Sequence, residues 1–183
     1  MSESTTYDVV LLVEQPLSAS DAARVRGLHE EVEEQVRYHV LLPVEDAAAR
    51  VESAMGSIAA SEVLASPALV MDSESVAEVQ RELLDKARTE CNGCVDKLAR
   101  TGADVSGEVV SLEPVEALAA KVAEVHAAEA IILTRKHVIA EFFHVDWTSR
   151  ARRRIGVPTL HLLEHESFDE QAEHYGGEGV TGL

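Results

Sequence analysis

Residues 107–164, GEVVSLEPVEALAAKVAEVHAAEAIILTRKHVIAEFFHVDWTSRARRRIGVPTLHLLE, carry the clearest indication of fold in this chain. Within them, apolar runs of strand length alternate with apolar residues at three- and four-residue steps, which is the spacing of a helix. A strand, a helix and a second strand in succession predict a right-handed βαβ unit and hence a parallel sheet. The expected elements are a strand at 105–112, a helix from 113, a strand at 130–133, a loop at 134–147, a short arginine-rich helix at 148–155 and a strand at 159–163.

The preceding residues continue this alternation. Apolar runs at 7–13 and 36–44 are each long enough for a buried strand. Between them we expect a helix that has Ser18 or Ser20 as its N-cap and ends near Gln35. Together with the three later strands, these runs predict an α/β fold, a single Rossmann-like three-layer domain in which helices cover both faces of a five-stranded parallel sheet.

A long amphipathic helix and two less regular segments complete the chain. Residues 73–100 repeat apolar side chains at helical spacing and stop before Gly102, a common helix terminator. Residues 46–72 fit the alternation poorly, so both a lid over the sheet and an insertion are consistent with them. The domain is expected to span 7–164, followed by an acidic, flexible tail at 165–183.

The composition predicts one globular domain with an acidic surface. Of the 183 residues, 46% are hydrophobic and only 4% are aromatic, which implies an aliphatic core. The net charge of −17 repels nucleic acid and anionic lipid. No apolar run approaches the ~20 residues that span a bilayer, and residues 1–6 are polar, unlike a signal peptide. We therefore expect a cytoplasmic protein that binds neither nucleic acid nor membrane.

The two cysteines, Cys91 and Cys94, form a Cys-x-x-Cys pair well inside the expected helix 73–100. A redox pair is usual at the start of a helix, where the helix dipole lowers the thiol pKa. A zinc site would need two further ligands at suitable spacing, which the sequence does not offer. We interpret both thiols as part of the apolar face of the helix.

The sequence contains no evident catalytic or metal-binding set. The run beginning at His29, HEEVE, starts like the His-Glu-x-x-His zinc motif but lacks its second histidine. His161 and His165 are four residues apart, but His161 lies in an expected strand, so the two do not share a helix face. A Gly-x-Ser-x-Gly nucleophile motif is also missing. We expect neither a metal site nor an enzyme.

Three motifs resemble the universal stress protein family. Residues 113–118, EPVEAL, resemble the family's helix start after its third strand, and residues 128–133, AEAIIL, resemble its fourth strand. Residues 156–162, GVPTLHL, resemble its closing strand. The resemblance covers most of 7–164 and implies the strand order 3-2-1-4-5.

The resemblance also bears on cofactors. Family members that bind ATP carry Gly-x-x-Gly after the fourth strand and Gly-Ser or Gly-Thr about nine residues later, because backbone amides must approach the phosphates. Here the first two positions fall near Thr134 and His137, and the later pair falls near Val145-Asp146 or Trp147-Thr148, so glycine is missing throughout. Glu14 also stands where nucleotide-binding members usually have aspartate. We expect no cofactor, and ATP and AMP are disfavoured.

A ligand crevice in such a sheet lies at the carboxyl ends of the first and fourth strands, where the strand order reverses. The Arg-Lys-His run beyond the fourth strand suits an anion, since cationic side chains can replace amide donors. The alternative is a solvated loop that offsets the acidic surface. The candidate ligand-binding residues are Glu14, Gln15, Thr134, Arg135, Lys136, His137 and Thr148.

A basic cluster follows the expected crevice loop. It consists of Arg150, Arg152, Arg153 and Arg154. Nucleic-acid binding would require a basic face, and the strongly acidic chain lacks interleaved aromatic residues there. We interpret the arginines as partners of carboxylates within the chain.

These observations favour a homodimeric, universal stress protein-like regulatory protein that neither hydrolyses ATP nor binds it in the usual way. The expected dimer contact is the edge strand Thr159–Leu163. A nucleotide- or anion-binding switch that uses the basic loop is the alternative. A third hypothesis, an ATP pyrophosphatase relative, would need an early glycine-rich phosphate loop, and residues 14–20 contain serines but no glycine.

Overall fold

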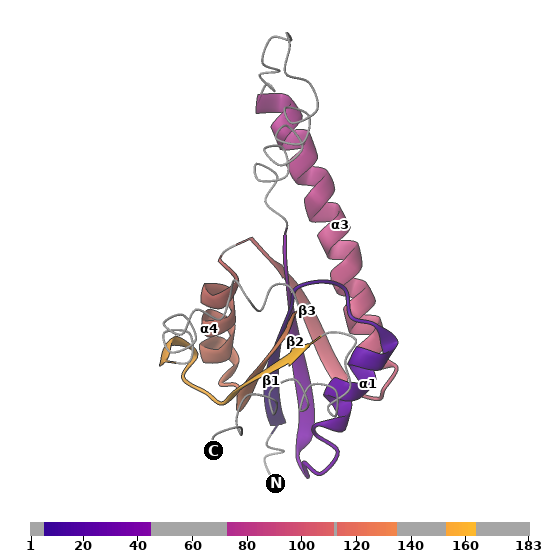
Figure 1. Cartoon of the computed structure of the whole chain (residues 1–183), viewed down its shortest axis with the longest axis vertical. Helices are drawn as coiled ribbons and strands as arrows, with labels where there is room; N and C mark the ends of the chain where they lie inside the picture. The colour runs from indigo at the N-terminus through magenta and orange to yellow at the C-terminus, as the bar shows by residue number, and fades with distance from the viewer. Residues whose placement is uncertain (1–5, 45–72, 112, 135–152, 164–183) are drawn as a thin grey trace, which may run out of the picture.

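A computed structural model describes residues 6–44, 73–111, 113–134 and 153–163. The expectations for residues 46–72, for 135–152 and for the tail lie outside these ranges. The described residues form a five-stranded sheet in the order β3-β2-β1-β4-β5, in which every neighbouring pair is parallel, with helices on both faces (Figure 1). The predicted α/β fold and strand order are confirmed.

The central strand of the sheet is β1 (Thr6–Val13), which pairs with β2 (Gln35–Pro43) on one side and with β4 (Glu129–Thr134) on the other. The edge strands are β3 (Asp104–Val110) and β5 (Thr159–Leu163). Helices cover both faces of β1 and β4, and most of their residues are buried. Burial on both faces explains why these two strands appear in the sequence as continuous apolar runs.

Among the described residues, three helices form the layers on the two faces of the sheet. Helix α1 (Ala19–Gly27) begins at a capping box, in which Ser18 and Asp21 satisfy each other's backbone N–H groups. It lies with α3 (Ser73–Ala99) on one face of the sheet, while α4 (Pro114–Val125) covers the other face (Figure 1). Figure 1 also shows that the amino-terminal part of α3 extends well beyond the sheet.

Alternate side chains of the strands fill two separate cores. In β1, Val9 and Leu11 pack beneath α1 and α3, whereas Val10 and Leu12 pack beneath α4. Both cores consist mainly of Val, Leu, Ile and Ala, as the low aromatic content predicted. Tyr38 is the exception, a large and fully buried aromatic side chain in the core beneath α1.

The first helix is shorter than predicted. We expected it to reach Gln35, but α1 ends at Gly27, and turns occupy most of residues 28–34 before β2 begins. Within these turns the His29 side chain enters the interior and is only 3% exposed. Its Nε2 lies 2.6 Å from Oε1 of Glu129 at the start of β4. The prediction was wrong because this contact, between residues distant in sequence, ends the helix.

The cysteines behave as predicted. Cys91 and Cys94 are both free thiols buried between α3 and the sheet. Burial, with smaller contributions from the neighbouring Cys94 and Glu108, raises the pKa of Cys91 to about 11. A thiol with such a pKa is almost entirely protonated at neutral pH and is a poor nucleophile. Both residues therefore serve as small apolar side chains of the helix face.

Candidate functional site

The carboxyl ends of β1 and β4 lie side by side. Val13 of β1 is in register with Leu133 of β4, and the N–H of Glu14 donates to the Leu133 carbonyl oxygen at 3.1 Å. Glu14 and Thr134 therefore lie at the same edge of the sheet, as predicted. In open parallel sheets, this edge is where ligands bind.

A pocket of about 240 Å³ opens beside this edge, between the ends of β1 and β2 and the flank of α3. Two of the predicted site residues, Glu14 and Gln15, line it. The sequence did not indicate that α3 contributes side chains to the same site. The described residues that line it are Glu14, Gln15, Pro16, Leu42, Pro43, Leu83, Lys86, Ala87 and Glu90.

The charged groups of the pocket are two carboxylates and one ammonium. Lys86 and Glu90 are one turn apart on α3, with Nζ 3.7 Å from Oε1, and Glu14 supplies the second carboxylate. Among the described residues, the lining therefore has one more acidic than basic side chain. Phosphate sites are instead built from backbone amides and cationic side chains, so these charges disfavour a phosphate in the pocket.

Thr134 ends β4 with a buried side chain. Its Oγ1 lies 2.7 Å from Nε2 of His161 on β5. Burial lowers the pKa of His161, so the imidazole is neutral at neutral pH and Nε2 can accept a hydrogen bond from the threonine hydroxyl.

The partly buried His161 leads us to expect a pH dependence of stability. Its folded-state pKa lies below the ordinary value of 6.5, so the unfolded chain takes up a proton first as the pH falls. The wild type should therefore lose stability as the pH falls through 6.5, by about 1.4 kcal/mol for each unit of pKa difference. His161→Gln should weaken this loss. Urea denaturation at about pH 7.5 and 5.5 measures it, and an identical loss in both proteins contradicts the prediction.

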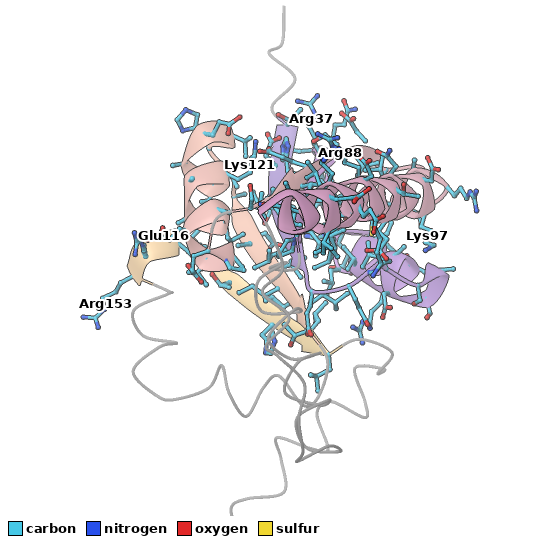
Figure 2. The ribbon with its side chains drawn as sticks, turned by 90° about the horizontal axis from the view of Figure 1, so that it is seen from above. Arg37, Arg88, Lys97, Glu116, Lys121 and Arg153 are labelled. Carbon is cyan, nitrogen blue, oxygen red and sulfur yellow. The ribbon has the colours of Figure 1, made fainter. Side chains whose placement is uncertain are left out.

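The remaining predicted site residues are Arg135, Lys136, His137 and Thr148, and all four lie outside the described residues. Within the basic cluster, the guanidinium of Arg154 contacts the Glu116 carboxylate of α4 at 2.7 Å, which confirms the predicted pairing for this arginine. In Figure 2, Lys97 and Arg153 lie on opposite sides of the view, whereas the labels of Arg37, Arg88 and Lys121 lie close together.

A buried polar network that the sequence did not predict lies at the other end of the strands, where β1 and β4 begin. His29 lies 2.6 Å from Glu129 through Nε2 and 2.7 Å from the Tyr38 hydroxyl through Nδ1. The Tyr7 hydroxyl donates to the second carboxylate oxygen of Glu129 at 3.3 Å. Burial raises the pKa of Tyr38 to about 12, so this hydroxyl remains protonated. The network joins β1, β2 and β4 to the turn after α1.

A second polar chain crosses three strands on the α4 face. His39 donates through Nε2 to Asp8 at 2.8 Å, and its Nδ1 lies 3.1 Å from the Ser106 hydroxyl. Burial would raise the pKa of Asp8, but hydrogen bonds from His39 and Thr6 outweigh it and hold the pKa below its ordinary value. His39 and Ser106 are directly opposite in the β2–β3 register, so we interpret the chain as a cross-strand polar ladder.

The described residues provide neither a cluster of metal ligands nor a helix suited to crossing a membrane. The described part of the chain contains no group of three or more histidine, cysteine or acidic side chains placed to hold a metal ion. Among the helices of the same residues, none combines the length and the apolar character that crossing a bilayer requires.

Sequence comparisons identify no relative: no family model matches the chain, and no curated protein does. Solved structures do match. The hypothetical protein MJ0577 has a TM-score of 0.60 at 12% identity, covering 88% of this chain and 98% of its own. Universal stress protein UspA from Lactobacillus plantarum has a TM-score of 0.51 at 14% identity, covering 86% and 99%.

A third match is a universal stress protein family protein from Arabidopsis thaliana, solved with AMP bound. Its TM-score is 0.50 at 12% identity, and the match covers 89% of this chain and 94% of that protein. At sequence identities this low, the structural similarity establishes a common fold and nothing more specific. The chain described here has the fold of the universal stress proteins.

Proposed function

We propose that this protein is a universal stress protein-like regulatory protein that acts as a homodimer and does not bind ATP in the usual way. The observation that carries the proposal is the Thr134 side chain, which is buried at the carboxyl end of β4 and contacts His161. A triphosphate needs close backbone approach there, which a side chain at this position obstructs.

The charges of the pocket support the same proposal. Glu14, which follows β1, and Glu90 of α3 both line the pocket, where Glu90 pairs with Lys86 at 3.7 Å. These carboxylates would repel a phosphate. As a general estimate, a pair of like unit charges at about 4 Å repels by about 1 kcal/mol in water and by about 4 kcal/mol at an effective dielectric constant of 20. The chain as a whole, with a net charge of −17, adds to the repulsion of a phosphate.

Native mass spectrometry of the freshly purified protein tests both parts of the proposal. We expect the mass of a dimer without retained nucleotide. In a thermal shift assay, ATP and AMP at about 1 mM should leave Tm unchanged, because a ligand present far below its Kd adds almost no stability. The Arabidopsis protein solved with AMP is the positive control. A retained nucleotide, or a clear rise in Tm with ATP or AMP, would show that the proposal is wrong.

The proposed dimer contact is the outer edge of β5, which among the described strands pairs with β4 alone. This strand lies at the end of the sheet, and Leu160 is its exposed large hydrophobic residue at 39%. An unpaired strand edge offers a row of backbone donors and acceptors to a second copy. Pairing about a two-fold axis would place the two β5 strands together and would bury Leu160.

Leu160→Lys is expected to weaken the dimer at least tenfold, because a charged side chain on an edge strand opposes pairing. The matched control is Leu160→Val, which keeps an apolar, strand-forming side chain and should remain dimeric. Sedimentation over a concentration series measures the association, and circular dichroism checks the fold. A Leu160→Lys variant that dimerises like the wild type would exclude this edge as the contact.

A second candidate is an anion-binding switch. It is favoured by the position of Thr134 at the crevice, since Arg135, Lys136 and His137 follow it directly in the sequence. In this case, a phosphate ligand should raise Tm, and Lys136→Glu should abolish the rise. The same nucleotide panel therefore separates the two candidates.

The proposed location is the cytoplasm. Both cysteines of the chain are free thiols. Reducing compartments keep thiols in this form, whereas secreted proteins more often pair them. Fractionation of cells that express the protein is the direct measurement.

A further inference from the structure

The cross-strand polar ladder on the α4 face has a definite direction of hydrogen bonding. Thr6 Oγ1 donates to Oδ2 of Asp8 at 2.8 Å, and Nε2 of His39 lies 2.8 Å from Oδ1 of the same carboxylate. An ionised carboxylate can only accept, so Nε2 carries the one ring hydrogen of a neutral imidazole. Nδ1 of His39 is then an acceptor, and the Ser106 hydroxyl, 3.1 Å away, donates to it.

This direction is the one that activates a serine as a nucleophile. An acceptor nitrogen beside the hydroxyl can take its proton, and a carboxylate on the other nitrogen stabilises the imidazolium that results. In the serine proteases, Nε2 of the histidine faces the serine and Nδ1 faces the aspartate, whereas in His39 the two nitrogens have exchanged places. Each nitrogen still has the role that the chemistry requires, one as acceptor and one as donor.

The serine end of the ladder is open, whereas the histidine and the aspartate are sheltered. Ser106 is exposed, and the side chains of His39 and Asp8 are only 15% and 14% exposed. Among the described strands β3 pairs with β2 alone, so its outer row of backbone N–H groups faces outward. Successive N–H groups of a strand alternate between its two edges, so either Ser106 or Gly107 presents one of them. A donor there can stabilise the oxyanion of an acyl transfer.

The surroundings of Ser106 favour a neutral substrate. Asp104, two residues before it, pairs with Arg37 at 2.8 Å, and Glu108, two residues after it, pairs with Lys121 at 2.6 Å. Residues two apart on a strand share one face, so both ion pairs flank the serine. Each carboxylate has a cationic partner, which leaves little local attraction for an ionic substrate. An open surface also selects weakly by shape, so a good leaving group must make the substrate reactive.

We propose that Ser106 is an activated nucleophile that hydrolyses small neutral esters with good leaving groups, with His39 as its general base and Asp8 as the residue that positions His39. Oγ bonds to the acyl carbon while Nδ1 takes the hydroxyl proton. The bond to the leaving alcohol breaks, and Nδ1 returns the proton to that alcohol. Water then attacks the acyl carbon and gives a proton to Nδ1, which passes it to Oγ as the carboxylic acid departs.

The inference goes beyond the proposed function, because this site lies on the α4 face and the pocket beside β1 lies on the α3 face. Either can fail without the other. No sequence motif indicates the site, since Asp8, His39 and Ser106 come from three separate strands that only the register brings together.

The test is the hydrolysis of 4-nitrophenyl acetate by the full chain at about pH 7.5, measured by the absorbance of the released nitrophenol. Ser106→Ala and His39→Gln should each lower the rate at least about tenfold, since a positioned general base contributes roughly 10²–10⁴-fold. The matched controls are Ser111→Ala and His126→Asn, which remove an exposed serine and an exposed imidazole outside the ladder and should leave the rate unchanged.

Two further measurements locate the nucleophile and define its partner. An alkyl fluorophosphonate bonds through phosphorus to an activated serine and releases fluoride, and peptide mass spectrometry should find this label on Ser106. In Asp8→Asn the amide can donate to Nε2 of His39, so the ring hydrogen should move to Nδ1. Nitrogen NMR of the imidazole detects this move, and the rate should fall with it. The Tm of each variant verifies that it is folded.

The inference is wrong if the wild type hydrolyses the ester no faster than Ser106→Ala does. It is equally wrong if the fluorophosphonate labels another residue or none, or if His126→Asn lowers the rate as much as His39→Gln, because surface imidazoles would then account for the hydrolysis.

Discussion

Gly107→Val is expected to destabilise the protein by about 3 kcal/mol, at the upper end of the usual cost of overpacking a core. Gly107 lies in the middle of β3, the strand on which α3 packs. A Cβ atom at this position would lie 2.6 Å from Cγ2 of Val95 and 2.8 Å from Sγ of Cys91, both on α3. These separations are well below van der Waals contact, so α3 would have to move away from the sheet.

The two neighbours cannot relieve the clash easily. Val95 is β-branched and therefore restricted to one preferred rotamer within a helix. Cys91 is buried in the core and is only 3% exposed. Gly107→Ala adds the Cβ alone and should cost less, about 1–2 kcal/mol. The glycine thus allows the close approach of a helix to an edge strand.

Gly93→Ala is the matched control, because it adds the same methyl group on α3 at a point where a Cβ meets nothing within 4 Å. It should stabilise the protein by about 0.5–1 kcal/mol, since alanine favours a helix more than glycine does. Urea denaturation at one protein concentration measures all three variants, so that the proposed self-association does not affect their comparison. Equal stabilities of Gly107→Val and the wild type would contradict the packing described for α3 and β3.

The sequence predicted most of the fold because the decisive signals are local. The apolar runs at 7–13 and 130–133 became β1 and β4, and Glu113-Pro114 marked the start of α4. The end of α1 could not be predicted in this way. The residues after Gly27 are compatible with a helix, and the contact that ends it joins His29 to Glu129, which is 100 residues away.

The sequence predicted the residues that the strand ends contribute to the candidate site, but not those that α3 contributes. Glu14 and Thr134 could be placed at one edge, because the carboxyl ends of neighbouring parallel strands always meet there. The contribution of Lys86 and Glu90 depends on where α3 crosses that edge, and helical periodicity gives the inner face of a helix but not its position along the sheet. The ladder of Asp8, His39 and Ser106 likewise required the strand register.

Glu129→Ala is expected to destabilise the protein by about 2–3 kcal/mol, because it leaves a buried imidazole without its strongest partner. Glu129 accepts from His29 Nε2 at 2.6 Å and from the Tyr7 hydroxyl at 3.3 Å. An ionised carboxylate can only accept, so Nε2 of His29 carries a hydrogen that the truncation leaves unsatisfied. The exposed fraction of His29 is 3%, so water cannot readily replace the lost acceptor.

Glu129→Gln separates the hydrogen bonds from the negative charge. The amide oxygen can still accept from His29, and the amide group can donate to the Tyr7 hydroxyl, so the expected loss is below about 1 kcal/mol. His29→Leu combined with Glu129→Ala removes both partners and should cost less than the sum of the two single changes, because neither polar group is then left without the other. Urea denaturation of the wild type, His29→Leu, Glu129→Ala and the double variant completes this cycle. If the losses simply add, the two side chains are not coupled, and the contact between them does not stabilise the turn that ends α1.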